Sequence, residues 1–423
     1  LLASLLLAPL LLATLLLASR ACCGTLAFKS IRGNEMRIIL AVAAALLVAV
    51  AIGVFGVLPA KLDHDMNAVT AHEPYAISAE ATALHDSLRV ADLHSDMLLW
   101  MRDPTRWNDR GHTDLPRLRA GRVALQVFAS VTKTPADMNY DSNTADSDNI
   151  TPLAIVQLWP LDTWTSIYAR ARFHARRLMR VAERSDGDFV VALTRGELAE
   201  ALERRAGDTD VLVGILATEG GHPFEGDLAN IDGLYDEGYR MIGLQHFFDN
   251  ELGGSLHGVS NAGLTDLGRA AVERIAGHGM IIDLAHSSQA VVRDVLDMTD
   301  VPLVISHTGI HGHCEAKRNI PDALMSEVAS RGGVIGIGFW ADVTCDDTPE
   351  GVAATLLAAI DLLGVEHVAL GSDYDGTITA TFDASEYAVL TDRLLAAGLS
   401  EADIRAVMGE NTIRFFLENL PEG

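Results

Sequence analysis

The sequence predicts a (β/α)8 barrel of the TIM type, preceded by an N-terminal transmembrane or signal helix. Short β-rich runs alternate with longer amphipathic segments through most of the chain. About eight such units fit into roughly 340 residues, as this barrel requires, and no Gly-rich dinucleotide loop follows the first strand. Polar side chains of metal-ligand types stand at the ends of the strand-like runs, where a barrel of this type places its chemistry.

An apolar segment near the N-terminus predicts a membrane helix. Residues 38–58 carry no charge, and these 21 residues are about what a helix needs to cross the hydrocarbon core. Lys29, Arg32 and Arg37 precede the segment, and Lys61, Asp63, His64 and Asp65 follow it. The positive-inside bias therefore places the large domain on the periplasmic or extracellular side of the cell membrane, in a single-pass protein. If the weak small-residue site 58–60 is cleaved, the protein is secreted instead.

Four segments are expected along the chain. Residues 1–35 are expected to be an extension from a start site assigned too early, because the first methionine is Met36. Residues 36–60 form the transmembrane anchor or signal segment, residues 61–83 a polar linker, and residues 84–421 the barrel. If residues 1–35 are real, their apolar run would form a membrane hairpin with the second segment, and the orientation argument weakens.

The barrel elements follow from the hydrophobic periodicity. Buried parallel strands are predicted over residues 211–217, 241–245, 280–284, 303–306, 334–339 and 368–371. Amphipathic helices are predicted over residues 230–237, 265–278, 288–297, 322–331 and 348–363, and a further helical segment over 164–184. The polar stretch 134–151 predicts a long surface loop or insertion.

Composition excludes several classes of protein. With 49% hydrophobic residues the chain is too apolar for disorder, and its net charge of −25 argues against a nucleic-acid surface. Four cysteines are too few for a disulfide scaffold. No HExxH helix or GxxxxGK[ST] loop is present, and the segment around Ser255 lacks the last glycine of a GxSxG elbow.

Candidate metal ligands gather at the predicted strand ends. His94 and Asp96 are two residues apart, so on a strand they face the same side and can hold one ion. Alone, such a pair is more typical of a cap or surface contact, and a single histidine at a strand end is more typical of a hydrogen-bonded core. Glu219, His286 and His307 close three further runs. The five together favour Zn²⁺ or similar divalent ions, two of which a glutamate can bridge. Their bound hydroxide would attack a carbonyl or phosphoryl centre.

Several motifs carry a resemblance to a known family. They are residues 92–96 (DLHSD), 115–121 (LPRLRAG), 219–222 (EGGH), 282–286 (IDLAH), 306–307 (SH), 317–322 (KRNIPD) and 371–376 (GSDYDG). Over about residues 84–417 the chain resembles the membrane dipeptidase (renal dipeptidase) family of metallopeptidases, within the amidohydrolase superfamily. The resemblance implies a metal-dependent hydrolase barrel that acts as a zinc-dependent dipeptidase on dipeptides with a free C-terminal carboxylate, by a metal-bridging hydroxide.

The resemblance also implies a role for each site residue. Two Zn²⁺ ions per chain are expected: His94 and Asp96 would bind one, His286 and His307 the other, and Glu219 both. Asp373 matches the acid/base group, His246 the contact to the scissile carbonyl and oxyanion, and Arg318 the partner of the substrate carboxylate. From the sequence alone, Asp373 beside Asp375 also fits a helix cap, and Arg318 a solvated loop cation.

The chain departs from the mammalian members after His246. Residues 247–255 (FFDNELGGS) resemble bacterial members, so the side-chain pocket and the preferred dipeptides stay open. Bacterial relatives often accept a C-terminal D-residue, and family members often form homodimers. Cys314 and Cys345 match a family disulfide, although two buried free thiols remain an alternative.

Two other functions are compatible with these residues. The same centre could hydrolyse another amide, a lactam or an ester, and loss of activity in Arg318→Ala would favour the dipeptidase over it. A catalytically dead barrel that only binds a partner is a further alternative, against which the intact ligand set and Asp373 argue. Such a dead domain need not hold two metal ions.

Overall fold

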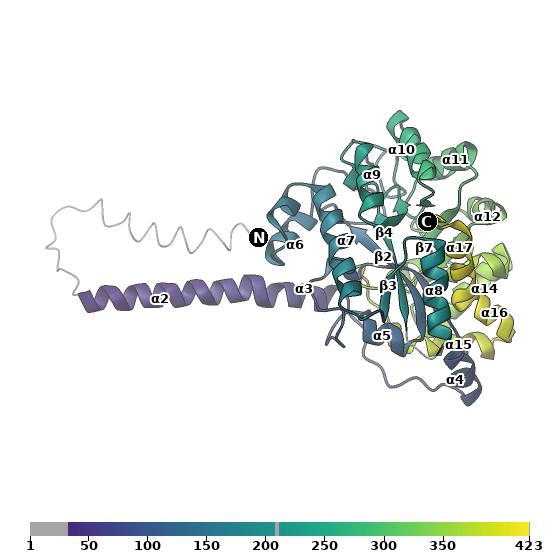
Figure 1. The fold of residues 1–423 in the computed structure, drawn as a ribbon, viewed down its shortest axis with the longest axis horizontal. Helices are drawn as coiled ribbons and strands as arrows, with labels where there is room; N and C mark the ends of the chain where they lie inside the picture. The colour runs from purple at the N-terminus through teal and green to yellow at the C-terminus, as the bar shows by residue number, and fades with distance from the viewer. Residues whose placement is uncertain (1–32, 208–210, 423) are drawn as a thin grey trace. The chain divides into compact units, whose positions relative to one another are not determined.

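Eight parallel strands close into a barrel in the computed structural model, which describes residues 33–207 and 211–422 (Figure 1). The strand order is β2-β1-β9-β8-β7-β6-β5-β4, and pairing of β2 with β4 closes the ring. The bounds are β1 Val90–Ser95, β2 Val123–Val131, β4 Leu212–Glu219, β5 Tyr239–Gly243, β6 Ile281–Asp283, β7 Leu303–Thr308, β8 Val334–Ile337 and β9 Val368–Leu370. A short strand, β3 (Phe189–Val191), pairs with β4. The predicted fold class is confirmed.

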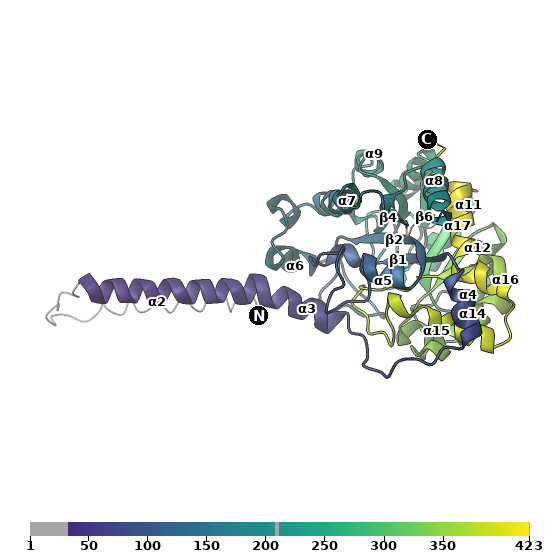
Figure 2. The ribbon, with the colours of Figure 1, turned by 60° about the horizontal axis from the view of Figure 1, so that its bottom comes forward.

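Helices surround the strands, as the two ribbon views show (Figures 1 and 2). They are α4 Ala79–Asp86, α5 Leu115–Ala120, α6 Ile150–Val156, α7 Ile167–Glu183, α8 Arg195–Ala206, α9 Ala229–Asp236, α10 Asp266–Gly277, α11 Gln289–Met298, α12 Asp322–Ser330, α13 Ala341–Thr344, α14 Pro349–Leu363, α15 Ala388–Ala396, α16 Glu401–Arg405 and α17 Asn411–Asn419. Hydroxyl caps begin many of them: the side chains of Ser166, Thr194, Thr265, Ser288 and Thr348 each accept a backbone N–H of the first turn. The helices predicted from periodicity all lie within two residues of these bounds or overlap them closely.

All residues of strands β1, β2 and β4 to β9 are buried, which explains their continuous apolar sequences. Because the strands are parallel, their C-terminal ends meet at one rim of the barrel. The polar residues that follow the strands in sequence therefore come together in space.

An apolar helix precedes the barrel unit. Helix α2 (Gly33–Ile52) continues through a π-helical turn, Gly53–Val57, into α3 (Leu58–Met66). Within the described part of the chain, Met36–Met66 is the one helix long and apolar enough to cross a membrane, which is consistent with anchoring. The compact unit that holds the barrel begins at Val54. Residues 1–32, which include Cys22 and Cys23 and most of the expected extension, lie outside the described residues.

Helix α3 is tied to the barrel by a buried ion pair. Asp63 accepts hydrogen bonds from Arg102 Nη1 at 2.6 Å and from Arg110 Nε at 3.0 Å. Arg102 also donates to Asp375, which follows β9, and Asn67 Oδ1 accepts the backbone N–H of Thr377 at 3.0 Å. The segment expected as a linker, residues 61–83, therefore begins within helix α3. The contacts of Asp63 and Asn67 hold this helix end against the loop after β9.

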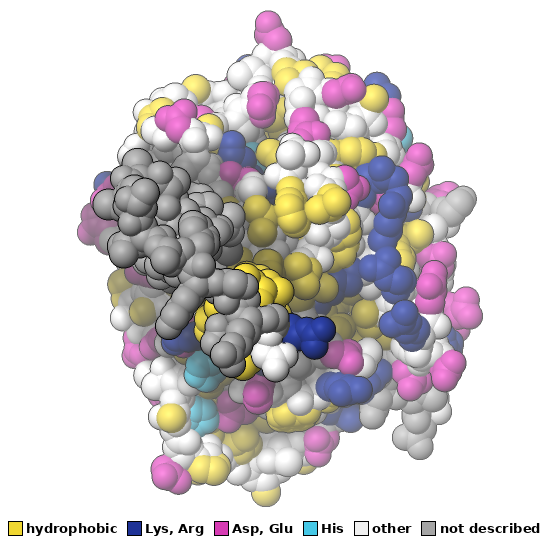
Figure 3. Space-filling view, turned by 90° about the vertical axis from the view of Figure 1, so that its left-hand side faces the viewer, with side chains coloured by type: hydrophobic (Ala, Val, Ile, Leu, Met, Phe, Trp, Pro, Cys, Tyr) yellow, Lys and Arg dark blue, Asp and Glu magenta, His cyan; other side chains and the backbone are white. Residues whose placement is uncertain are grey.

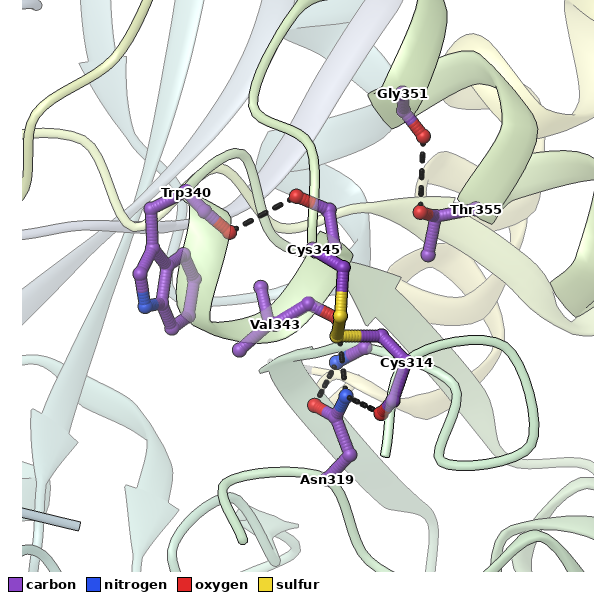
Figure 4. The surroundings of a disulfide bond; sticks show 9 residues. Cys314, Asn319, Trp340, Val343, Cys345, Gly351 and Thr355 are labelled. Atoms are coloured by element: carbon purple, nitrogen blue, oxygen red, sulfur yellow. Dashed lines mark hydrogen bonds between the residues drawn. A yellow bond between two sulfur atoms is a disulfide. The ribbon is translucent and has the colours of Figure 1, made fainter. Parts of the chain in front are cut away.

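A disulfide joins two loops at the rim of the barrel (Figure 4). Cys314 follows β7 and Cys345 follows α13, with 5.6 Å between their Cα atoms. Asn319 reinforces the junction, since its Nδ2 donates to the backbone oxygens of Cys314 at 3.0 Å and Val343 at 2.9 Å (Figure 4). The bond excludes the alternative of two free thiols and fixes the loop that carries Arg318.

Removing this disulfide should destabilise the fold. The bond closes a loop with a sequence separation of 31 residues. We expect Cys314→Ser/Cys345→Ser to lower the free energy of unfolding by about 3–4 kcal/mol, the loop-closure entropy for that length. Urea unfolding of the variant, compared with the unaltered protein with and without reductant, measures this loss. An equal free energy of unfolding in all three samples would contradict it.

Candidate metal centre

The rim formed by the C-terminal ends of the strands carries the predicted site residues. His94 lies one residue before the end of β1, and Asp96 directly follows that strand. Glu219 is the last residue of β4, and His307 lies in β7. His246, His286 and Asp373 each lie three residues after the end of their strand, β5, β6 and β9 respectively. Arg318 comes from the loop after β7. All eight side chains are buried, with Asp373 the most exposed at 8%.

Four histidines converge on one carboxylate oxygen. Oε1 of Glu219 lies 3.6 Å from Nε2 of His94 and 3.3 Å from Nε2 of His246. The same oxygen lies 3.2 Å from Nε2 of His286 and 3.3 Å from Nε2 of His307. Donor atoms that share one zinc ion stand about 3.3 Å apart, because each bond is about 2.0–2.2 Å long and the geometry is tetrahedral. The spacing therefore suits metal coordination.

Several buried polar atoms of these residues have no hydrogen-bond partner in the described part of the chain, and this shows whether the residues suit a metal ion. Nε2 of His94, Oδ1 of Asp96 and Oε2 of Glu219 are buried, and none has a hydrogen-bond partner within the described residues. A buried polar atom without a partner costs about 1–3 kcal/mol unless something else satisfies it. Imidazole nitrogens and carboxylate oxygens are ligands that Zn²⁺ and similar ions prefer. The donor set fits divalent metal.

The ligand atoms fall into two groups that share Glu219. One group holds His94, Glu219, His307 and Asp373, and the other holds Glu219, His246 and His286, with the atoms of each group within 4.8 Å of one another. The expected pairing put His307 with His286, and His246 outside the ligand set. Asp96 belongs to neither group, although its Oδ1 lies 3.5 Å from Nε2 of His94.

A serine sets the tautomer of two histidines. Ser306 donates its hydroxyl proton to Oδ2 of Asp283 at 2.6 Å, so its oxygen can only accept from the histidines. Nδ1 of His307 lies 2.8 Å and Nδ1 of His94 lies 3.2 Å from that oxygen. Both Nδ1 atoms therefore carry a proton, and both Nε2 atoms face the site, where a bound metal ion would take the place of a proton on Nε2.

Hydrogen bonds to a buried aspartate hold the strand that carries His94 in place. Asp92 is fully buried and accepts the hydroxyls of Ser372 at 2.6 Å and Tyr387 at 2.9 Å. It also accepts the backbone N–H groups of Ser372 and His94 at 2.9 and 3.2 Å. These bonds join β1 to the loop after β9, and so fix His94 relative to Asp373.

Burial and charge act in opposite directions on the site's pKa values. Burial lowers the pKa of His246, His286 and His307 well below the usual range, with nearby cationic groups adding to the effect. Burial also opposes charge on His94, but three carboxylates, led by Asp96, outweigh it and raise the pKa of His94 to about 10. The carboxylates thus attract positive charge, which divalent ions would supply.

Asp373 is held close to the other carboxylates by an unusual backbone. Its φ is 61°, as is that of His286, and a non-glycine residue in this left-handed region costs about 1–3 kcal/mol, a cost that tends to occur at functional sites. Burial raises the pKa of Asp373, with His94 opposing and Asp96 adding to the rise. At Gly376 a Cβ would stand 2.4 Å from Oδ1 of Asp373 and 2.9 Å from Oδ2 of Asp96, so only glycine fits there.

Asp375 has a structural role and does not cap a helix. It accepts from Arg102 and Thr113, and from the backbone N–H of His112 at 2.7 Å. These partners lower its pKa even though burial raises it. The two aspartates of the motif 371–376 are therefore separated by their surroundings, with only Asp373 open to the metal ligands.

Arg318 is a buried cation without a carboxylate partner. It is 1% exposed, and among the described residues no carboxylate oxygen lies within ion-pair distance of its guanidinium. Nη2 donates to the backbone oxygen of His307 at 2.8 Å, while Nε has no partner within the described residues. Nη2 of Arg318 lies 3.2 Å from Nε2 of His286. This position excludes the interpretation of Arg318 as a solvated loop cation.

Residues from the 134–151 loop also reach the site, which the sequence did not indicate. Trp340 Nε1 donates to the Tyr140 hydroxyl at 3.0 Å, and the Tyr140 ring lies 5.2 Å from that of His257. Burial raises the pKa of Tyr140 to about 12, with Arg318 opposing and Asp373 adding to the rise. The only signal in the sequence was a lone tyrosine within an otherwise polar insertion.

Comparison with known proteins gives similarities that cover most of the chain. The sequence profile of the membrane dipeptidase family (peptidase family M19) matches residues 78–420. Dipeptidase verJ from Clonostachys rogersoniana is 29% identical over 310 residues, which cover 72% of this chain and 74% of that protein. A crystal structure of dipeptidase AC, a metallo peptidase of family M19, is 25% identical, with a TM-score of 0.64 over 80% of this chain and 100% of its own.

One structural relative holds a ligand. It is a metallo peptidase from Rhodobacter sphaeroides liganded with a phosphinate mimic of the dipeptide L-Ala-D-Ala. It is 25% identical to this chain, with a TM-score of 0.62 over 79% of this chain and 99% of its own.

Proposed function

Because this chain belongs to the membrane dipeptidase family, peptidase family M19, and is a metallo-dipeptidase, we propose that it cleaves dipeptides with a free C-terminal carboxylate, including those with a C-terminal D-residue. The observation that carries this proposal is the convergence of four histidine Nε2 atoms within 3.2–3.6 Å of Oε1 of Glu219. The D-residue is supported by the Rhodobacter sphaeroides relative that binds a mimic of L-Ala-D-Ala.

Two zinc ions are proposed to occupy the centre. His94 and Asp96 would hold one, His286 and His307 the other, and Glu219 both. The presence of Glu219 in both ligand groups supports its shared role, although those groups place His307 with His94. Bound there, the ions would lower the pKa of a shared water, so that hydroxide is available near neutral pH, and would polarise the scissile carbonyl.

The chain's own residues would position the substrate and move the proton. Asp373, whose Oδ1 lies 3.9 Å from Nε2 of His94, is proposed to take the proton of the attacking water and to give it to the departing amine. Burial keeps the His246 imidazole neutral, so one of its nitrogens can donate to the carbonyl oxygen as that oxygen becomes negative.

Arg318 is proposed to bind the substrate carboxylate. Its guanidinium is buried and has no acidic partner in the part of the chain that the structure describes, so a dipeptide carboxylate would supply the missing counter-charge through paired N–H bonds. Such a contact fixes the distance from the carboxylate to the scissile bond, and this distance selects dipeptides over longer peptides.

The chain is further proposed to be held at a cell membrane by Met36–Met66, with the barrel on the periplasmic or extracellular side. The basic residues before the apolar segment and the mixed charges after it support this orientation. Carbonate extraction and protease protection of the full chain in sealed membranes test attachment and side.

The assignment can be tested by hydrolysis of L-Ala-D-Ala and L-Ala-L-Ala by the detergent-solubilised full chain. Activity should disappear on chelation and return when zinc is restored, with two zinc ions bound per chain by elemental analysis. A zinc-loaded, folded protein that cleaves neither dipeptide would contradict the proposed substrate class.

Replacing Arg318 should weaken recognition of the carboxylate specifically. We expect Arg318→Ala to lower kcat/KM for L-Ala-D-Ala by roughly 30-fold to 3,000-fold, since truncating one partner of a buried charge pair costs about 2–5 kcal/mol. L-Ala-D-alaninamide, which lacks the carboxylate, should be a poor substrate of the unaltered enzyme and lose little further rate in the variant. An equal loss on both substrates would mean that Arg318 only holds the fold.

A further inference from the structure

A groove lined by arginines lies on the side of the barrel near helix α7. This groove, here called the arginine groove, has a volume of about 510 Å³. Its lining includes Arg102, Arg119, Arg177, Arg180 and Arg184. Only two acidic side chains, those of Asp103 and Asp188, line it. Basic side chains form a band on this face of the molecule (Figure 3). In a chain with a net charge of −25, this concentration of positive charge is unusual.

Arg102 is paired with Asp63 and Asp375, whereas Arg177 has no carboxylate within ion-pair distance among the described residues. Arg177 donates to the backbone oxygens of Leu98 at 2.9 Å and Arg102 at 2.8 Å, and to no carboxylate within the described residues. Burial lowers the pKa of Arg177 to about 10, and repulsion from Arg102 and Arg180 adds to the effect. Like charges kept this close favour binding of an anion.

Two further arginines present their charge to the outside. Arg180 in α7 and Arg184, which directly follows the helix, are exposed and stand three and seven residues after Arg177. Neither forms an ion pair with any described residue. Asp103 is already bound by Thr105 and by Arg106. An exposed guanidinium without a carboxylate partner can bind two oxygens of a phosphate group through its paired N–H donors.

The groove lies close to helix α3, which follows the apolar segment in the chain. Arg102, in its lining, is bonded to Asp63 of α3. Asp63 lies five residues after Leu58, the first residue of α3, which is about 7.5 Å of helix. If the uncharged residues 38–58 are inserted in a bilayer, the groove lies within reach of the lipid headgroups.

An exposed apolar turn adjoins the groove. Leu158 and Leu161, between α6 and α7, are 63% and 73% exposed, and Met101 in the groove lining is 46% exposed. Gln157 joins the turn to the groove, because its Oε1 accepts the backbone N–H of Met101 at 2.7 Å. Exposed leucines beside arginines are typical of surfaces that lie at a membrane interface, and a site for a soluble anion does not need the leucines.

We propose that the arginine groove binds the phosphate groups of anionic phospholipids, while Leu158 and Leu161 enter the boundary between headgroups and acyl chains. This contact holds the barrel against the membrane in one orientation, beyond what a single helix would achieve. It goes beyond the proposed dipeptidase activity and depends on the proposed anchor only for the nearness of the bilayer.

The test uses the full chain in nanodiscs of phosphatidylcholine, with and without about one third phosphatidylglycerol, and amide hydrogen exchange as readout. The segments around residues 98–106 and 177–188 should exchange more slowly in the anionic discs. We expect at least about a fivefold slowing, because each arginine at an anionic surface contributes about 1 kcal/mol. Co-purification of the chain with both kinds of disc shows separately that the anchor is inserted.

Arg180→Glu/Arg184→Glu should abolish this slowing and leave dipeptide hydrolysis unchanged. The matched control is Arg293→Glu/Arg414→Glu, which makes the same charge change on α11 and α17, away from α7 (Figure 1). The control should keep the slowing.

Three results would overturn the proposal. Equal exchange in both kinds of disc would show no headgroup contact, and slowing that survives the α7 variant would place the contact elsewhere. Inorganic phosphate that slows the same segments in phosphatidylcholine discs as strongly as phosphatidylglycerol does would make the groove a site for a soluble anion.

Discussion

Glu219→Gln is expected to abolish metal binding and to lower kcat/KM for L-Ala-D-Ala on the order of a thousandfold or more, because loss of the ions removes several kcal/mol of charge stabilisation in the transition state. Oε1 of this residue lies within 3.6 Å of four histidine nitrogens, so no other side chain is as central to the proposed centre. Elemental analysis and dipeptide hydrolysis measure the two effects.

The thermal stability of this variant gives an independent readout. In metal-free protein, burial raises the pKa of Glu219 well above its usual range, with Asp96 adding to the rise, so a neutral glutamine should be tolerated there. Zinc should raise the Tm of the unaltered protein by mass action and leave that of the variant unchanged. Glu200→Gln, on an exposed face of α8, is the matched control and should behave as the unaltered protein. A variant that still binds two ions would remove Glu219 from its proposed bridging role.

Asp373→Asn is expected to lower kcat by about 10²–10⁴-fold while both metal ions stay bound, because general acid–base catalysis contributes a factor of that size. The amide keeps the shape of the carboxylate and cannot take a proton from water. Stopped assays of L-Ala-D-Ala hydrolysis, with metal content measured on the same sample, test the prediction.

The metal content decides between two roles for Asp373. Its oxygen falls in one group with those of His94, Glu219 and His307, so a ligand role is the competing hypothesis. Loss of one ion per chain in Asp373→Asn would favour the ligand and contradict the proton-transfer role. Asp361→Asn, at an exposed position of α14, is the control for loss of one charge.

Asp375→Asn should behave differently, although it lies only two residues away. Asp375 is fully buried and binds Arg102, Thr113 and the backbone of His112, so its loss should lower stability before it lowers the rate of a folded sample. The contrast between the two variants separates chemistry from structure within one motif.

The barrel and the position of its site residues at one rim could be predicted from the sequence, because both follow from local patterns in the chain. Apolar runs of strand length and amphipathic stretches depend on near neighbours in the chain, and parallel strands place their C-terminal ends on the same side. His94, Glu219 and His307 could therefore be named before any contact was known. The resemblance to the family supplied the roles, which periodicity could not.

Other features of the site depend on contacts between residues far apart in sequence. Tyr140 reaches Trp340 across 200 residues, and Ser306 reaches His94 across 212. Nothing in the local pattern distinguishes such a tyrosine or serine from one at the surface, because its partners are brought near only when the ring of strands closes.

The sequence by itself thus determined the apolar N-terminal helix, the (β/α)8 barrel and the identity of the polar residues at its rim. Only the tertiary structure decided that Asp63 is buried against Arg102, that Cys314 bonds to Cys345, that Arg318 has no acidic partner among the described residues and that five arginines line one groove. The physical reason is that periodicity reports which face of an element is buried. Burial, charge pairing and hydrogen bonding of a given side chain depend on which other elements the closed barrel packs beside it.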